Sequence, residues 1–123
     1  MKNLFSLLIC AHLSAFAWAQ NSDSATYFQQ KGLEEKKARR FRQAENNFAK
    51  AFQLAPSNSD VLVEWGNVLV EQRRYREAHD KFARAEAAGN KNPAVIENLA
   101  TLSYNLRMWQ DAIKYAQKMQ QAK

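Results

Sequence analysis

Few side chains in this 123-residue sequence have the type and spacing that catalysis requires. His79 precedes Asp80, but adjacent residues of a helix point in different directions, so the two cannot act as a pair. The single cysteine, Cys10, and the only other histidine, His12, lie in the first twenty residues. The sequence has no glycine-rich phosphate loop and no set of zinc ligands. We therefore expect no catalytic residue, no cofactor and no metal site, and we interpret His79 as a polar residue on a helix surface.

Basic side chains are the stronger candidates for binding, because they recur at a fixed distance along the chain. The net charge is +6, which suits an acidic partner without identifying one. The recurring positions form a set that we call the basic ridge: Arg39, Arg40, Arg73, Arg74 and Arg107. Such a row could meet an acidic protein, an anionic envelope polymer or lipid headgroups, or it could be a solvated row of turn residues.

The first nineteen residues have the order of a secretory signal peptide. Lys2 is the charged start, residues 4–16 are mostly apolar, and Ala17-Trp18-Ala19 fits a cleavage site. The apolar run is short for a membrane span, which takes about 20 residues. We expect cleavage after Ala19, with an uncleaved anchor as the alternative. The protein is then exported, to the periplasm in a Gram-negative bacterium and otherwise to the medium, and we expect no nucleic-acid partner.

A period of thirty-four residues organises the rest of the chain. Ala44, Phe48 and Ala51 return as Ala78, Phe82 and Ala85, and more faintly as Ala112, Ala116 and Met119. A fixed period of this length is the signature of a repeat array, in which each unit buries its apolar face by stacking on a neighbour. After a flexible lead-in over residues 20–24, the units are residues 25–58, 59–92 and 93–123.

Each unit has the pattern of two helices joined by a short turn. Apolar residues recur at helical spacing over residues 25–38, 41–54, 60–72, 75–87, from 93 onward and around 109–119. Pro56 ends the second helix, Gly89 ends the fourth, and Asn92 followed by Pro93 is a favoured start for the fifth. Because the basic residues mark the turns, stacking should place the basic ridge along one edge. The predicted fold class is all-α, an α-solenoid of three antiparallel helix hairpins.

The units resemble tetratricopeptide repeats (TPRs). The pattern of that family has a large apolar residue followed by a small one, then an aromatic, alanine, aromatic, alanine and proline. The second unit matches with Trp65, Gly66, Tyr75, Ala78, Phe82 and Ala85. Two positions depart from the pattern: Lys31 stands where a large apolar residue is usual, and Ala116 replaces the second aromatic.

The resemblance implies a binding groove, because in this family the first helices of the hairpins line a concave face that holds peptides or partner helices. Carried over by register, the groove residues are Gln29, Leu33, Lys36, Val63, Asn67, Val70, Glu97, Asn98, Thr101, Tyr104 and Asn105. Asparagine can both donate to and accept from a peptide unit, which suits an extended peptide. The alternative is that Leu33, Val63 and Val70 only pack the hairpins together.

The resemblance also bears on the partner. One subtype of the family binds a C-terminal carboxylate with basic residues. None of the residues at the matching positions of this sequence is basic; they are Gln29, Leu33, Glu64, Ala94 and Asn98. The outer face of the last helix would stay partly exposed or be covered by another chain. We expect an exported protein–protein interaction module, an adaptor or assembly factor of the bacterial envelope. The alternative is a small structural subunit that self-associates through its last helix.

Overall fold

The structure, a computed structural model, describes the backbone of residues 3–123 and the side chains from Gln20 onward. Six helices and no strand make up this part of the chain: α1 (Asn3–Lys37), α2 (Phe41–Leu54), α3 (Ser59–Glu71), α4 (Tyr75–Ala87), α5 (Pro93–Asn105) and α6 (Trp109–Gln121). The all-α prediction is confirmed. The side chains of residues 1–19, the predicted signal peptide, lie outside the described residues, so its cleavage stays a prediction.

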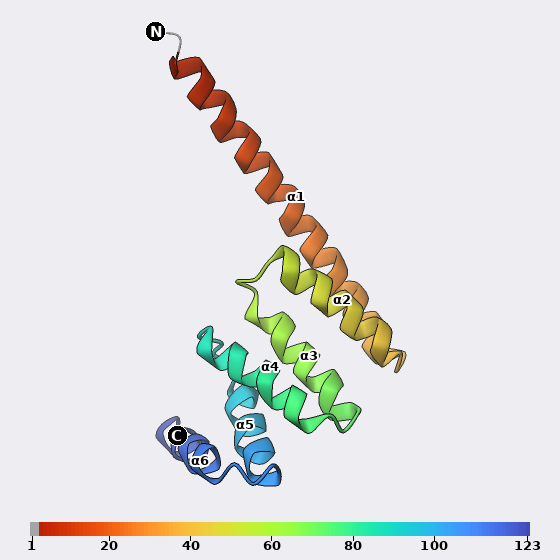
Figure 1. Ribbon diagram of the computed structural model, residues 1–123, viewed down its shortest axis with the longest axis vertical. Helices are drawn as coiled ribbons and strands as arrows, with labels where there is room; N and C mark the ends of the chain where they lie inside the picture. The colour runs from red at the N-terminus through yellow and green to blue at the C-terminus, as the bar shows by residue number, and fades with distance from the viewer. Residues whose placement is uncertain (1–2) are drawn as a thin grey trace.

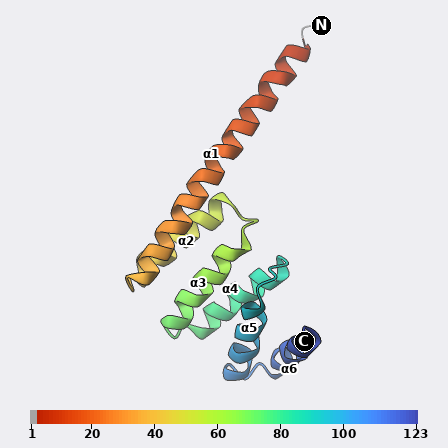
Figure 2. The ribbon, with the colours of Figure 1, turned by 180° about the vertical axis from the view of Figure 1, so that it is seen from behind.

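The helices pair into three antiparallel hairpins, α1 with α2, α3 with α4 and α5 with α6, which stack in chain order (Figure 1). The second helix of each hairpin packs against the first helix of the next, α2 against α3 and α4 against α5. Seen from behind, the hairpins follow one another in the same order, each turned relative to the one before (Figure 2). This arrangement is the predicted α-solenoid.

Helix α1 begins earlier than the sequence pattern indicates. Residues 20–24, predicted as a flexible lead-in, are helical and continue α1 without a break. Asparagine, serine and aspartate are only moderately poor helix formers, and neither glycine nor proline interrupts this stretch. Thr26 Oγ1 donates a hydrogen bond to the Ser22 carbonyl at 3.0 Å, one helical turn away. The predicted start at residue 25 is therefore too late.

The turns inside the three hairpins share one backbone conformation. Arg39, Arg73 and Arg107 have φ angles of 57°, 59° and 60°, in the left-handed region that glycine adopts most easily. In the second hairpin the Arg73 N–H donates to the Val70 carbonyl and the next N–H donates to the Leu69 carbonyl, both at 2.9 Å. This Schellman arrangement ends the helix and reverses the chain. A residue with a side chain costs roughly 1–2 kcal/mol in this conformation.

The apolar core follows the stack as two adjoining clusters. The first holds Ala44, Phe48, Ala51, Val61 and Val68, and the second holds Leu62, Val63, Leu69, Ala78, Phe82, Ala85, Val95, Leu99, Leu102 and Tyr115. Phe48 has no exposed surface and its ring lies against Gly32, where an added methyl group would come within 2.6 Å of the ring. The core therefore depends on the close approach of an aromatic ring to a bare helix backbone.

The connections between hairpins contain two helix caps, Asn58 and the predicted Asn92. At the start of α3, Asn58 Oδ1 accepts a hydrogen bond from the Asp60 N–H at 3.2 Å. At the start of α5, Asn92 Oδ1 accepts from the Ala94 N–H at 3.0 Å, and Pro93 occupies the first turn. Each cap satisfies a backbone donor that the helix itself leaves free, so both connections are fixed by local sequence.

Candidate functional site

The predicted groove residues lie on α1, α3 and α5, the first helices of the three hairpins. Helices α1 and α3 contact each other directly, and α5 follows them along the stack (Figures 1 and 2). Leu33, Asn67 and Thr101 are thirty-four residues apart and occupy the same position in successive hairpins. The first two are half-buried and Thr101 is exposed. We call these three residues the central row of the candidate site.

One predicted groove residue does not reach the surface. Val63 is 4% exposed and belongs to the second core cluster, so its prediction as a groove residue was wrong. Helix α3 belongs to the middle hairpin and is packed by helices on both sides, which widens its buried face beyond that of a single hairpin. Leu33 and Val70 are half-buried and pack against the core, which agrees with the alternative that they help to hold the hairpins together.

Two polar groove residues are held by bonds to the second hairpin or to the connection that leads into it. Lys36 Nζ donates to Glu64 Oε2 at 2.7 Å and so connects α1 with α3. Gln29 Oε1 accepts a hydrogen bond from Asn58 Nδ2 at 3.0 Å. Because their side chains are already bonded, Lys36 and Gln29 form fixed walls of the candidate site rather than free ligand-binding groups.

The groove residues of α5 present most of their surface to solvent. Glu97, Thr101, Tyr104 and Asn105 are exposed. Asn98 is half-buried and donates to the Ala94 carbonyl of its own helix at 2.9 Å. Tyr104 is 65% exposed, and its ring meets that of Trp109 edge to face with 5.7 Å between centroids. The candidate site is therefore most accessible on the third hairpin.

The turns that carry the basic ridge lie along one edge of the array, as predicted (Figure 1). Arg39, Arg73 and Arg107 are exposed. Within the described residues only Arg39 of these three has an acidic neighbour, Glu71 at 3.7 Å, and exposed pairs of this kind contribute little. Arg39 also lies over the ring of Phe41, 5.2 Å from its centroid, but all three guanidinium groups remain open to solvent and to an acidic ligand.

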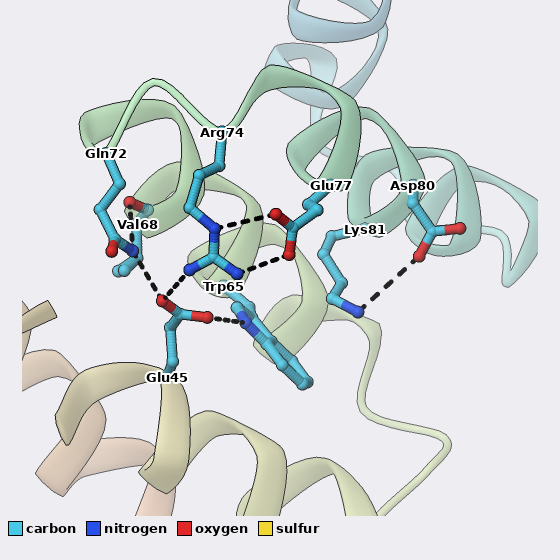
Figure 3. A network of polar contacts seen from close by, with 8 residues as sticks. All are labelled: Glu45, Trp65, Val68, Gln72, Arg74, Glu77, Asp80 and Lys81. Atoms are coloured by element: carbon cyan, nitrogen blue, oxygen red, sulfur yellow. Dashed lines mark hydrogen bonds and ion pairs between the residues drawn. The ribbon is translucent and has the colours of Figure 1, made fainter. Parts of the chain in front are cut away.

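The other two members of the basic ridge are paired with acidic side chains of the same chain. Arg40 forms an ion pair with Glu35, and this hydrogen bond holds the pKa of the Glu35 carboxyl below its usual value. Arg74 Nη1 donates to Glu45 Oε1 at 2.6 Å, and its Nε donates to Glu77 Oε1 at 2.9 Å (Figure 3). Arg74 therefore helps to join two hairpins, whereas the pair that Arg40 forms is exposed and contributes little.

Glu45 is the centre of the polar network that joins the first two hairpins (Figure 3). Besides Arg74, it accepts hydrogen bonds from Gln72 Nε2 at 2.7 Å and from Trp65 Nε1 at 3.4 Å. Only 16% of the Glu45 side chain is exposed. The carboxylate of α2 is thus held by three donors from the second hairpin, which fixes how the two hairpins pack.

His79 lies at the junction of the second and third hairpins rather than on a free surface. Its Nε2 is 3.0 Å from Oγ of Ser103, which has no exposed surface. Burial lowers the pKa of His79, with Asp111 and Asp80 acting in the opposite direction. Sequence reasoning missed Ser103, although the period places His79 where Glu45 contacts the next hairpin. No substrate can reach a fully buried hydroxyl, so the arrangement supports packing rather than catalysis.

Among the described residues, no group of three or more histidine, cysteine, aspartate or glutamate side chains is placed to hold a metal ion. No helix of this part of the chain combines the length and the apolar character needed to cross a bilayer.

This chain is similar to known proteins in its fold rather than in its sequence. No protein-family model matches the sequence, and no curated protein matches it. The structure of YrrB, a TPR protein with an unusual peptide-binding site, matches with a TM-score of 0.73 and 26% identity over 85% of this chain and 54% of YrrB. The present chain therefore spans about half the length of YrrB.

Two further solved structures match at lower identity. The TPR domain of Arabidopsis OM64 gives a TM-score of 0.72 with 17% identity over 80% of this chain and 82% of that domain. The first TPR of Spaghetti (RPAP3), bound to the HSP90 peptide SRMEEVD, gives a TM-score of 0.72 with 15% identity over 80% and 78% of the two chains. The matched part covers 80% or more of the present chain in each case.

Proposed function

The chain folds as a tetratricopeptide-repeat array, and we propose that it is an exported module that binds a segment of a partner protein across α1, α3 and α5. The observation that carries this proposal is the central row, which places an apolar, an amide and a hydroxyl side chain at equivalent positions on these three helices. Two similar arrays support it, since YrrB is described by a peptide-binding site and the Spaghetti array holds an HSP90 peptide.

The chemistry of the central row suits an extended polypeptide. Asn67 can donate to a peptide carbonyl and accept from a peptide N–H through the same side chain, and the Thr101 hydroxyl can do the same. Leu33 occupies the equivalent position on α1. It is half-buried, and its exposed part offers apolar surface to a partner side chain. Repeating main-chain contacts of this kind hold a peptide in place, while the flanking side chains select its sequence.

Some polar side chains of the candidate site are already fixed in the absence of a partner. The bonds from Lys36 to Glu64 and from Asn58 to Gln29 fix side chains that would otherwise lose freedom on binding. Each rotamer-rich side chain that is ordered only on binding costs about 0.5–1.5 kcal/mol. A preformed site therefore favours binding. Because the polar groups of Lys36 and Gln29 are already bonded within the chain, we do not propose them as direct contacts to the partner.

The basic ridge indicates that the partner carries negative charge. Arg39, Arg73 and Arg107 favour an acidic protein segment running along the edge of the array. We propose an adaptor or assembly role in the envelope, in the periplasm of a Gram-negative source, with no catalytic step.

The experiment that tests this function compares two paired variants in affinity purification from the envelope fraction of the source. Asn67→Ala with Thr101→Ala removes two polar groups of the central row and should weaken binding of the wild-type partner by about 10- to 100-fold. Asn46→Ala with Gln53→Ala changes two exposed side chains of α2 and should leave binding unchanged. Equal recovery of the partner with both pairs would show that it binds elsewhere.

A further inference from the structure

Two ion pairs join the first two hairpins where the candidate site meets the basic ridge. Lys36 Nζ donates to Glu64 Oε2 at 2.7 Å, and Arg39 Nη1 lies 3.7 Å from Glu71 Oε2. Both carboxylates belong to α3, and both cations belong to the first hairpin. Two cations therefore meet two carboxylates at this junction, and the chain itself neutralises the charge.

The junction of the second and third hairpins keeps only one of these four charges. The equivalent residues, thirty-four positions further along the chain, are Val70, Arg73, Asn98 and Asn105. Both carboxylates are thus replaced by amides, and only the turn arginine remains charged. Arg73 is exposed, and none of the ion pairs among the described residues includes it. At these four positions the second junction therefore carries a positive charge that the chain does not neutralise.

Solvent reaches this position in every hairpin. Lys37, Glu71 and Asn105 are equivalent residues at the ends of α1, α3 and α5, and all three are exposed. Arg39 and Arg73 are likewise equivalent and exposed, although each is followed by a further hairpin of the array. Stacking of one hairpin on the next therefore leaves this edge open, so a ligand can reach Arg73 and Asn105.

Asn105 connects this edge to the central row of the candidate site. It follows Thr101 by four residues on α5, so the two side chains lie on one face of the helix, one turn apart. Glu71 follows Asn67 in the same way on α3. A carboxylate beside Arg73 can accept hydrogen bonds from the guanidinium group and from the Asn105 amide. A segment lying on the central row therefore has a carboxylate-binding position within one helical turn.

We propose that an acidic side chain of the bound segment takes, at the second junction, the place that the Glu71 carboxylate takes at the first. Arg73 and Asn105 bind this aspartate or glutamate and so select for it by charge complementarity. The preference rests on the proposed peptide-binding function and adds the residue type that the site recognises. A side chain suits the position better than a C-terminal carboxylate, because a segment that crosses α1, α3 and α5 passes the middle hairpin with its interior (Figure 1).

Selection of peptides from a random library displayed on phage tests this preference with the purified protein. The wild type should enrich peptides that share an aspartate or glutamate at one interior position. Asn105→Glu gives Arg73 a carboxylate of its own chain, as Glu71 does for Arg39, and should abolish the acidic preference. Arg73→Gln should abolish it as well, because the cation is lost.

Two control variants separate this site from a general effect of charge. Asn105→Gln keeps the amide and should keep the acidic preference. Gln110→Glu adds one negative charge at an exposed position of α6, away from the second junction, and should keep it too. Equal loss of the preference in Gln110→Glu and Asn105→Glu would mean that only the overall charge matters, and the proposal would be wrong.

Binding of one enriched peptide, synthesised with an amidated C-terminus, measures the contact. Replacing its acidic residue by the matching amide should weaken binding to the wild type by about 2- to 5-fold, the range of an exposed ion pair. The same replacement should leave binding to the Arg73→Gln variant almost unchanged. If the amide peptide regains its affinity when its own C-terminus is a free carboxylate, the site binds a chain end and the proposal is overturned.

The selection also separates this proposal from the function on which it rests. If the wild type enriches peptides without an acidic preference, and Asn67→Ala with Thr101→Ala no longer binds them, the groove binds peptides but the carboxylate position is wrong. An acidic preference that persists in Arg73→Gln overturns the proposal in the same way. If no peptide is enriched at all, the peptide-binding function fails together with it.

Discussion

The ring of Phe82 lies directly against the backbone of Gly66, so that a methyl group added to Gly66 would come within 2.9 Å of Phe82 Cζ. The same relationship joins Phe48 to Gly32 in the first hairpin. In the third hairpin the two positions are Ala100 and Ala116. Where the glycine of the first helix is replaced by alanine, the aromatic ring of the second helix is also absent. This indicates that the two positions of each hairpin are sterically coupled.

The Gly66–Phe82 contact predicts strong coupling between two substitutions. Gly66→Ala should lower the free energy of unfolding by about 1–3 kcal/mol through overpacking, and Phe82→Ala by about 3–5 kcal/mol through loss of a fully buried ring. In the double variant the added methyl group meets no ring, so the cost of Gly66→Ala should nearly vanish. Urea unfolding of the four proteins measures the cycle, and simple additivity would contradict it.

Arg73 predicts opposite effects on stability and on binding. Since its φ is 59°, Arg73→Gly should raise the free energy of unfolding by about 0.5–1 kcal/mol, the relief of strain being partly offset by the greater freedom of glycine when unfolded. The same change should weaken binding of an acidic partner and reduce its salt dependence. Gly89→Ala is the matched control: φ is 82° and nothing lies within 4 Å, so backbone strain alone should destabilise it.

His79 predicts a loss of stability in acid. Burial lowers its folded-state pKa below the unfolded value of about 6.5, so the unfolded chain binds the proton more readily. The contribution of neutral His79 is therefore complete above about pH 6.5 and declines as the pH falls below that value. Thermal unfolding between pH 7.5 and 5 should show this decline, and His79→Gln should flatten it relative to the wild type. An unchanged pH profile in the variant would remove His79 as the cause.

The Glu45 network predicts a contrast between two acidic residues that both bond to Arg74. Glu45→Ala removes the acceptor shared by Trp65, Gln72 and Arg74 and should cost about 1–3 kcal/mol of unfolding free energy. Glu77→Ala removes an exposed partner while Glu45 remains, and it should cost less than about 0.5 kcal/mol. Similar losses for the two variants would mean that the junction does not depend on Glu45.

The hairpins could be read from the sequence because the period, the turns and the caps all depend on local residues. Helices α2 and α4 have the predicted bounds, and Asn58 and Asn92 cap the helices that they precede. Val63 was misassigned because burial on α3 depends on neighbours from two hairpins, which the periodicity of one helix does not record. The partner of His79 was missed for a related reason, since Ser103 is defined only by stacking.

The basic ridge and the early start of α1 mark other limits of sequence reasoning. The pattern predicted that the ridge would follow one edge, but it could not separate Arg74, which is engaged by Glu45, from Arg73, which is exposed. The lead-in over residues 20–24 contains weak helix formers, and its conformation depends on the helix to which it is joined. In both cases the outcome rests on contacts that residue type alone does not specify.

Site-specific photo-crosslinking in the source organism tests the central claim, that the first helices receive a partner protein. A photoreactive side chain placed at position 67 should trap a specific polypeptide, and the same group at position 101 should trap the same one. At position 46, on the exposed surface of α2, it should trap none. If position 46 captures the partner while positions 67 and 101 capture nothing, the binding surface lies elsewhere and the account is wrong.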